Sequence, residues 1–79
     1  MLSRNQKFAV VVSYQLLSFW DTSTNQQIGT TIKQTSRIGA VALSPSDECL
    51  ATGEKNGKVT LRSLYGILPA SYLAVNVSD

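Results

Sequence analysis

Residues that catalyse reactions or bind metals are sparse in this sequence. It contains one cysteine, Cys49, and no histidine. A cysteine nucleophile needs a neighbouring base, most often histidine, to form its reactive thiolate, so Cys49 is expected to be a small buried residue near the start of a strand. The five acidic residues include only one adjacent pair, Asp47-Glu48, which is typical of a solvated turn, and no glycine-rich phosphate loop is present. We therefore expect no enzymatic activity, no catalytic residue, no cofactor and no metal site.

Composition narrows the class of protein further. The 79 residues carry a net charge of +2 and are 43% hydrophobic, which is ordinary for one small folded domain. A weak, dispersed positive charge does not indicate binding to nucleic acid or to an anionic membrane. One cysteine excludes an internal disulfide. Residues 1–7 are too polar for a secretory signal and residues 64–77 are too short and polar to span a bilayer. We expect a cytoplasmic protein, with a nuclear location left open.

The stretch from Ala40 to Ser63 contains the most regular pattern. Residues 41–43, 49–52 and 58–62 are predicted to be short strands, and Ser44-Pro45-Ser46-Asp47 is a turn sequence. Asn56-Gly57 is the strongest short hairpin signal, because both central residues of a type I′ turn need positive φ. This stretch therefore predicts an antiparallel β-meander.

The same unit occurs earlier in the chain. Residues 8–21 align without a gap onto residues 50–63, with Ala9 on Ala51 and therefore an offset of 42 positions (51 − 9). A period in the forties, with a strand-turn-strand unit that ends in Trp-Asp, is typical of propeller blades with four strands each. Phe19-Trp20-Asp21 and Val41-Ala42-Leu43-Ser44-Pro45 resemble the WD-repeat β-propeller family, and the resemblance covers residues 7–64.

The resemblance implies an all-β fold. We expect an antiparallel β-meander of about seven strands that forms part of a WD-repeat β-propeller, incomplete and not closed. Residues 1–79 are taken as one partial propeller, with an N-terminally truncated first blade at 7–33 and a second blade at 37–79. The remaining strands are predicted at 8–12, 16–20, 26–33 and 38–43, with the outer strand of the second blade supplied by 64–79. Fewer than two blades cannot close a ring, so we expect the isolated chain to associate, aggregate or be partly ordered.

Two local features follow from the same patterns. The continuous apolar run at 8–12 predicts a strand that is covered on both faces. Positive φ is expected at four turn residues where the hairpin pattern or the family places such a conformation: Asn25, Asp47, Asn56 and Gly57.

The family's structural motif is only partly present. The resemblance implies that Trp20 packs between blades and that Asp21 anchors the following turn. In the second repeat Thr52 keeps the position where Ser or Thr is common, and Asn56 and Gly57 form the predicted hairpin turn. Family members link their strands by a hydrogen-bonded relay of Trp, Ser or Thr, His and Asp. Here its positions are altered: Lys33-Gln34 replaces Gly-His, Arg62-Ser63 replaces Trp-Asp, and Val10 stands where Ser or Thr is common. The relay is therefore expected to be incomplete, leaving the blades to rely on apolar packing.

The function implied by the resemblance is non-catalytic protein interaction within a scaffold. In the family, the loop before the innermost strand and the loop between the second and third strands form a rim that commonly binds peptides, and Arg37, Gly39 and Lys55 map onto it. Since no acidic residue lies between Thr22 and Ser46, an acidic or phosphorylated peptide is the expected partner, together with other propeller blades. The alternative is a self-contained small β-barrel-like domain that binds peptide or nucleic acid. The repeat argues against it, and the lack of clustered basic and aromatic residues argues against nucleic acid.

Overall fold

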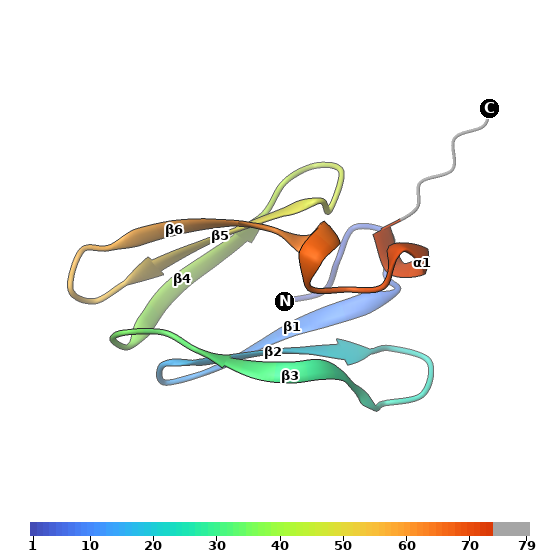
Figure 1. The fold of residues 1–79 in the computed structure, drawn as a ribbon, viewed down its shortest axis with the longest axis horizontal. Coiled ribbons are helices and arrows are strands. Elements are labelled where there is room, and N and C mark those ends of the chain that lie inside the picture. Colours follow the sequence, from blue (N-terminus) through green and yellow to red (C-terminus); the bar gives the residue numbers. More distant parts are fainter. Residues whose placement is uncertain (74–79) are drawn as a thin grey trace.

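The structure, a computed structural model, describes residues 1–73 and contains two antiparallel three-stranded sheets (Figure 1). The first sheet consists of β1 (Phe8–Ser13), β2 (Leu16–Asp21) and β3 (Gln27–Lys33), in that order. The second consists of β4 (Ile38–Leu43), β5 (Cys49–Glu54) and β6 (Val59–Ser63). The all-β class and these six strands are confirmed, with each predicted boundary within two residues of the observed one.

The C-terminal segment is helical where a seventh strand was predicted. Leu64–Gly66 form a 3₁₀ turn, η1, and Ala70–Leu73 form the short helix α1. The N–H groups of Ile67 and Leu68 both donate to the carbonyl of Leu64, at 3.0 and 2.8 Å. Leu64 and Leu68 are four residues apart, so a helical turn places both on one face, and Pro69 fits before a helix because its missing N–H is not needed there. Residues 74–79 of the expected strand lie outside the described residues.

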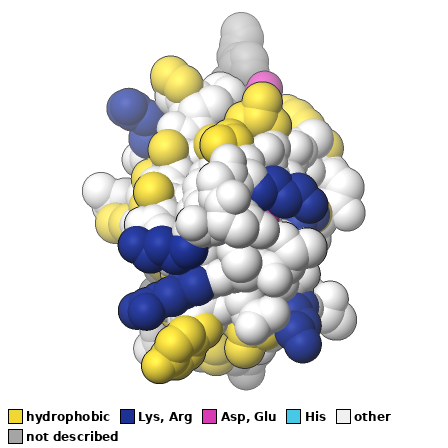
Figure 2. Space-filling model, turned by 90° about the vertical axis from the view of Figure 1, so that its left-hand side faces the viewer, with side chains coloured by type: hydrophobic (Ala, Val, Ile, Leu, Met, Phe, Trp, Pro, Cys, Tyr) yellow, Lys and Arg dark blue, Asp and Glu magenta, His cyan; other side chains and the backbone are white. Residues whose placement is uncertain are grey.

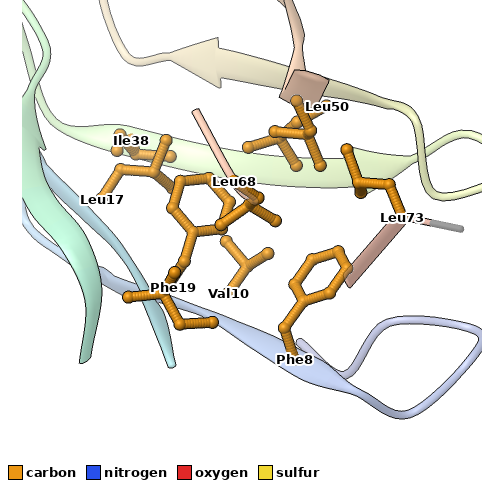
Figure 3. Packing of buried hydrophobic residues seen from close by; sticks show 10 residues of the cluster. Phe8, Val10, Leu17, Phe19, Ile38, Leu50, Leu68 and Leu73 are labelled. Carbon is orange, nitrogen blue, oxygen red and sulfur yellow. The ribbon is translucent and has the colours of Figure 1, made fainter. Parts of the chain in front are cut away.

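One hydrophobic core lies between the two sheets (Figure 3). Phe8 and Phe19 of the first sheet pack with ring centroids 6.3 Å apart, tilted by 58°. Leu50 of the second sheet and Leu68 and Leu73 of the C-terminal segment approach them from the other side. The C-terminal segment thus completes the core that the two sheets leave open. The buried apolar side chains are Phe8, Val10, Leu17, Phe19, Ile28, Ile38, Leu50, Leu64, Leu68 and Leu73.

The apolar run that begins β1 is covered on one face only, so the expectation of two covered faces was wrong. Phe8 and Val10 are fully buried, whereas Val11 is 45% exposed. The reason is that no described segment lies over the outer face of the first sheet. Alternate residues of a strand point to opposite faces, so Val11 points away from the core. Val12 is on the same face as Phe8 and Val10 but is still 36% exposed.

The turns confirm three of the four predicted conformations. Asn25, Asp47 and Gly57 have φ of 60°, 64° and 91°, but Asn56 does not have positive φ. The β5–β6 connection is a three-residue loop, Lys55–Gly57, in which Gly57 N–H donates to Glu54 C=O and Glu54 N–H donates to Lys58 C=O, both at 2.9 Å. A three-residue loop needs left-handed backbone only at its last residue, whereas a type I′ turn needs it at both.

This loop also breaks the gap-free correspondence between the two repeats. In the first sheet the turn has two residues, so Val10 pairs with Phe19, whereas in the second sheet Thr52 pairs with Thr60. The register beyond the turn is shifted by one residue, and such a shift moves side chains to the opposite face. Leu17 and Phe19 are therefore fully buried, while their sequence equivalents Val59 and Leu61 are 71% and 73% exposed.

The preceding turn does repeat between the two halves. Ser3 N–H donates to Phe8 C=O at 2.9 Å, as Ser44 N–H does to Cys49 C=O. Each serine hydroxyl also accepts the N–H of the same partner, at 3.2 Å from Phe8 and 3.1 Å from Cys49. Gln6, with φ of 62°, occupies the place of Asp47. Residues 2–8 and 43–49 therefore have the same local structure.

Candidate functional site: the basic end

Three connections meet at one end of the molecule. The β1–β2 turn is bonded to the loop before β4, because Tyr14 C=O accepts the N–H of Ile38 at 2.8 Å and Gln15 C=O accepts that of Gln34 at 2.7 Å. The β5–β6 loop is bonded to the same segment, since Lys55 N–H donates to Arg37 C=O at 2.8 Å. These bonds hold the three connections in one rigid arrangement.

Four exposed basic residues surround these connections, and we call them the basic end: Lys33, Arg37, Lys55 and Lys58. Lys33 ends β3 beside the start of β2, and Lys58 directly precedes β6, so all four lie at the same ends of their sheets. Figure 2 views this side and shows Lys and Arg side chains spread across it, with an acidic side chain visible near its upper edge. The three predicted rim residues, Arg37, Gly39 and Lys55, are brought together here.

Arg37 stacks on an aromatic ring that the sequence reasoning did not single out. Its guanidinium carbon lies 5.1 Å from the centroid of the Tyr14 ring, which is within cation–π range. Tyr14 is 72% exposed and has φ of 53°. A bulky residue in left-handed backbone is uncommon. The available signal was its position in the three-residue gap between the strands predicted at 8–12 and 16–20, where it aligns with Asn56 of the other repeat.

Lys55 lies over Gly39. A Cβ atom added to Gly39 would be 3.4 Å from Lys55 Cε and 3.6 Å from its Nζ. Because Gly39 has no side chain, the aliphatic part of the Lys55 side chain can lie against its backbone. This contact places an ammonium group close to the first residues of β4.

Glu54 is the one acidic residue at the basic end among the described residues, and it is buried. Its Oε1 accepts from the Thr35 hydroxyl at 2.7 Å, from Ser36 N–H at 2.8 Å and from the Ser36 hydroxyl at 3.3 Å. The bond from Thr35 is the main reason that the pKa of Glu54 lies below its ordinary value of 4.5, with the Ser36 bonds and the charge of Lys58 acting in the same direction and burial opposing them. The carboxylate therefore stays ionised and fixes the loop before β4, rather than facing a ligand.

Next to Glu54 lies a hydrogen-bonded network at the positions where an incomplete relay was expected. Gln34 Nε2 donates to the Thr52 hydroxyl at 3.0 Å and to Glu54 Oε2 at 3.5 Å, and Arg62 donates to Gln34 Oε1. Gln34 and Thr52 are buried. The histidine and tryptophan of the family's relay are replaced here, and the amide of Gln34 and the guanidinium of Arg62 form a different hydrogen-bonded network at these positions. Arg62 Nε is buried without a hydrogen-bond partner within the described part of the chain.

The first repeat's motif residues lie away from the basic end. Trp20 is half-buried on the outer face of the first sheet, and its Nε1 donates to Ser18 Oγ at 3.0 Å. Asp21 Oδ1 accepts the N–H groups of Ser23 and Thr24 at 2.8 and 3.0 Å, which holds the β2–β3 turn, and its Oδ2 accepts from the Tyr72 hydroxyl. The bond from Tyr72 is the main reason that the pKa of Asp21 lies below its ordinary value.

Three further features of residues 1–73 bear on metal binding, membrane insertion and cysteine chemistry. Within that range no group of three or more His, Cys, Asp or Glu side chains is arranged to hold a metal ion. Neither described helix is long and apolar enough to cross a membrane. Cys49 is half-buried at the start of β5.

Comparisons with known proteins add no family assignment. No protein-family model, no curated protein and no solved structure matches this chain. The resemblance to WD-repeat proteins therefore remains a prediction from the residues.

Proposed function

We propose that this chain is a non-catalytic protein-interaction segment of the WD-repeat propeller type, acting in the cytoplasm, which binds an acidic or phosphorylated peptide of a partner protein at the basic end. The observation that carries the binding proposal is the charge distribution. Four exposed basic side chains surround three hydrogen-bonded connections, and the nearby carboxylate of Glu54 is buried and engaged. A rigid cluster of cations without exposed acids favours anionic ligands through charge-assisted hydrogen bonds.

Two observations support the WD-repeat part of the proposal. Residues 2–8 and 43–49 form the same turn, in which Ser3 and Ser44 make equivalent hydrogen bonds. Gln34, Thr52 and Arg62 stand at positions where the resemblance places the relay, and hydrogen bonds from Gln34 to Thr52 and from Arg62 to Gln34 join them. In this interpretation, other propeller blades would cover the outer faces of the two sheets.

One observation favours the alternative, a self-contained small β-domain. Leu64, Leu68 and Leu73 complete the core between the sheets from within the same chain. Such a domain can also bind a peptide at the basic end, so the peptide proposal does not depend on the propeller.

The binding proposal is tested by fluorescence anisotropy with a labelled eight-residue peptide of glutamate and phosphoserine. Reversing two charges in the Arg37→Glu, Lys55→Glu protein should weaken binding by about tenfold or more, because hydrogen bonds to charged groups contribute about 1.5–3 kcal/mol each. The matched control, Arg4→Glu with Lys7→Glu, makes the same charge change outside the basic end and should change the affinity less than about twofold.

Three results would contradict this proposal. Unchanged binding by the Arg37, Lys55 variant would exclude the basic end. Equal losses in both variants would mean that only net charge matters. Tighter binding of a single-stranded oligonucleotide of equal charge would indicate a nucleic-acid site instead, since clustered cations with an exposed aromatic ring are also used for that purpose.

A further inference from the structure

A small apolar pocket adjoins the basic end. It has a volume of about 240 Å³ and is lined by five residues, which we call the β4 pocket: Val12, Ile38, Gly39, Ala40 and Val41. None of these side chains is polar. Ligand sites for whole drug-sized molecules usually exceed about 300 Å³ and contain several polar groups. The size and lining of the β4 pocket therefore suit a single aliphatic side chain better than a complete small molecule.

The pocket and the cationic site share a residue. Gly39 lines the pocket, and the same residue lies under the Lys55 side chain, whose Nζ would be 3.6 Å from a Cβ at that position. Arg37 directly precedes Ile38, another lining residue. A ligand with an aliphatic group in the pocket therefore has its neighbouring atoms close to at least one ammonium group.

The backbone beside the pocket is an unpaired strand edge. Among the described strands β4 pairs only with β5. Its first N–H, that of Ile38, is bonded to Tyr14 C=O at 2.8 Å, and the residues after Ile38 have no second described strand beside them. An edge strand has N–H and C=O groups that are free to bond an added strand, and extended peptides use such edges while neighbouring pockets read their side chains. The chemistry here suits an extended polypeptide.

We propose that the basic end recognises an extended protein segment in which an aliphatic side chain directly neighbours an acidic or phosphorylated residue. The aliphatic side chain occupies the β4 pocket and the anion contacts Lys55. This inference rests on the proposed peptide-binding function and specifies which peptides bind. The anionic group alone gives a low affinity, and the neighbouring aliphatic side chain increases that affinity.

The test compares two labelled peptides that differ at one position. Both contain phosphoserine and glutamate, and the residue after the phosphoserine is Leu in one and Gly in the other. The Leu peptide should bind about tenfold more tightly, which corresponds to roughly half or more of the transfer energy of a fully buried leucine. In ¹⁵N-resolved NMR spectra of the natural protein, the amides of Gly39, Ala40 and Val41 should shift with the Leu peptide and much less with the Gly peptide. This mapping requires no variant.

A pocket-filling variant gives an independent readout. Gly39→Val adds a branched side chain at a residue that lines the pocket, where its Cβ would lie against the Lys55 side chain, and valine is well tolerated in strands. The ratio of the two peptide affinities should fall from about ten to about one. Gly53→Val is the matched control: it makes the same substitution in the neighbouring strand, where an added Cβ meets nothing within 4 Å, and it should keep the ratio near ten.

The possible failures are distinguishable. If both peptides bind equally to the natural protein, or if the three amides do not shift, the pocket inference is overturned while the charge-based function stands. An unchanged ratio in Gly39→Val also overturns it. If neither peptide binds, the proposed function itself is wrong and the pocket inference falls with it.

Discussion

The guanidinium of Arg37 lies 5.1 Å above the ring centre of Tyr14, a residue whose backbone φ is 53°. Left-handed backbone costs an ordinary residue roughly 1–2 kcal/mol, whereas an exposed cation–π contact contributes about 0.5–1 kcal/mol. The tyrosine is therefore a poor choice for the turn itself. Its ring contacts the guanidinium of Arg37, whose carbonyl accepts the N–H of Lys55, so we infer that Tyr14 serves the cationic site rather than the turn.

Substitutions at Tyr14 should separate the conformational cost from the ring contact. Tyr14→Ala loses the ring and keeps an unfavourable conformation, while Tyr14→Asn loses the ring and tolerates positive φ. We expect the asparagine variant to be more stable than the alanine variant by about 0.5–1 kcal/mol, measured by urea unfolding at pH 7. Both should bind the acidic peptide more weakly than the natural protein. Equal stability of the two variants would show that the turn is not strained.

The buried network around Gln34 should behave as one unit. Gln34→Leu and Thr52→Val each leave a hydrogen-bonding group without its partner, and each should lower the free energy of unfolding by about 1–3 kcal/mol. The double variant should lose less than the two changes combined, by about 1 kcal/mol, because the second substitution removes a partner that is already gone. Gln27→Leu, which removes an exposed bond to Thr31, serves as the control and should cost little. Additive losses would mean that Gln34 and Thr52 do not interact in solution.

Acid should destabilise the protein through Asp21 and Glu54. The folded-state pKa of both carboxyl groups lies below the ordinary values of 3.8 and 4.5. A depressed pKa in the folded state stabilises the protein above the unfolded-state value and loses this effect as the pH falls through the folded-state value. We therefore expect the urea midpoint to be steady above about pH 5 and to fall steadily below it.

The variant Tyr72→Phe tests which contact is responsible for the Asp21 part. It removes the hydroxyl that donates to Asp21 Oδ2, so its acid-induced loss of stability should be smaller than that of the natural protein. Tyr14→Phe removes a hydroxyl that is not bonded to a carboxylate among the described residues and should leave the acid dependence unchanged. Identical pH curves for Tyr72→Phe and the natural protein would contradict the assignment.

The outer face of the second sheet should promote self-association of the isolated chain. This face carries the small or apolar side chains of Ala40, Ala42, Ala51, Val59 and Leu61, and the last two are 71% and 73% exposed. Large exposed apolar patches are typical of interaction surfaces. We expect sedimentation of the 79-residue chain to depend on concentration and Leu61→Lys to reduce that dependence. The control Thr30→Lys adds the same charge at an exposed position of β3 and should not change the concentration dependence.

A different outcome would decide between the two fold interpretations. A natural chain that sediments as a monomer and melts sharply at a temperature independent of concentration would contradict the propeller fragment. It would favour the self-contained domain.

Local patterns predicted the strands well, because each strand is a short run of apolar or alternating residues that lies between recognisable turn residues. Asn25, Asp47 and Gly57 were predictable for the same reason, since few residues tolerate positive φ. The helical turn at Leu64 was missed because its apolar residues also suit a strand, and only the core between the sheets determines which conformation buries them. The site was partly predictable: Arg37, Gly39 and Lys55 follow from the repeat, but Tyr14 and the network at Gln34 depend on contacts between distant connections.

The three-residue loop Lys55–Gly57 also has a consequence for how such repeats can diverge. Deleting one residue from it would give a two-residue connection like that at Tyr14-Gln15 and would exchange the two faces of β6. Val59 and Leu61 would then face the interior, and Thr60 and Arg62 would face outward. A single deletion in a surface loop, with no change inside either strand, would thus take Arg62 out of the buried polar network and put apolar side chains of β6 in the interior instead.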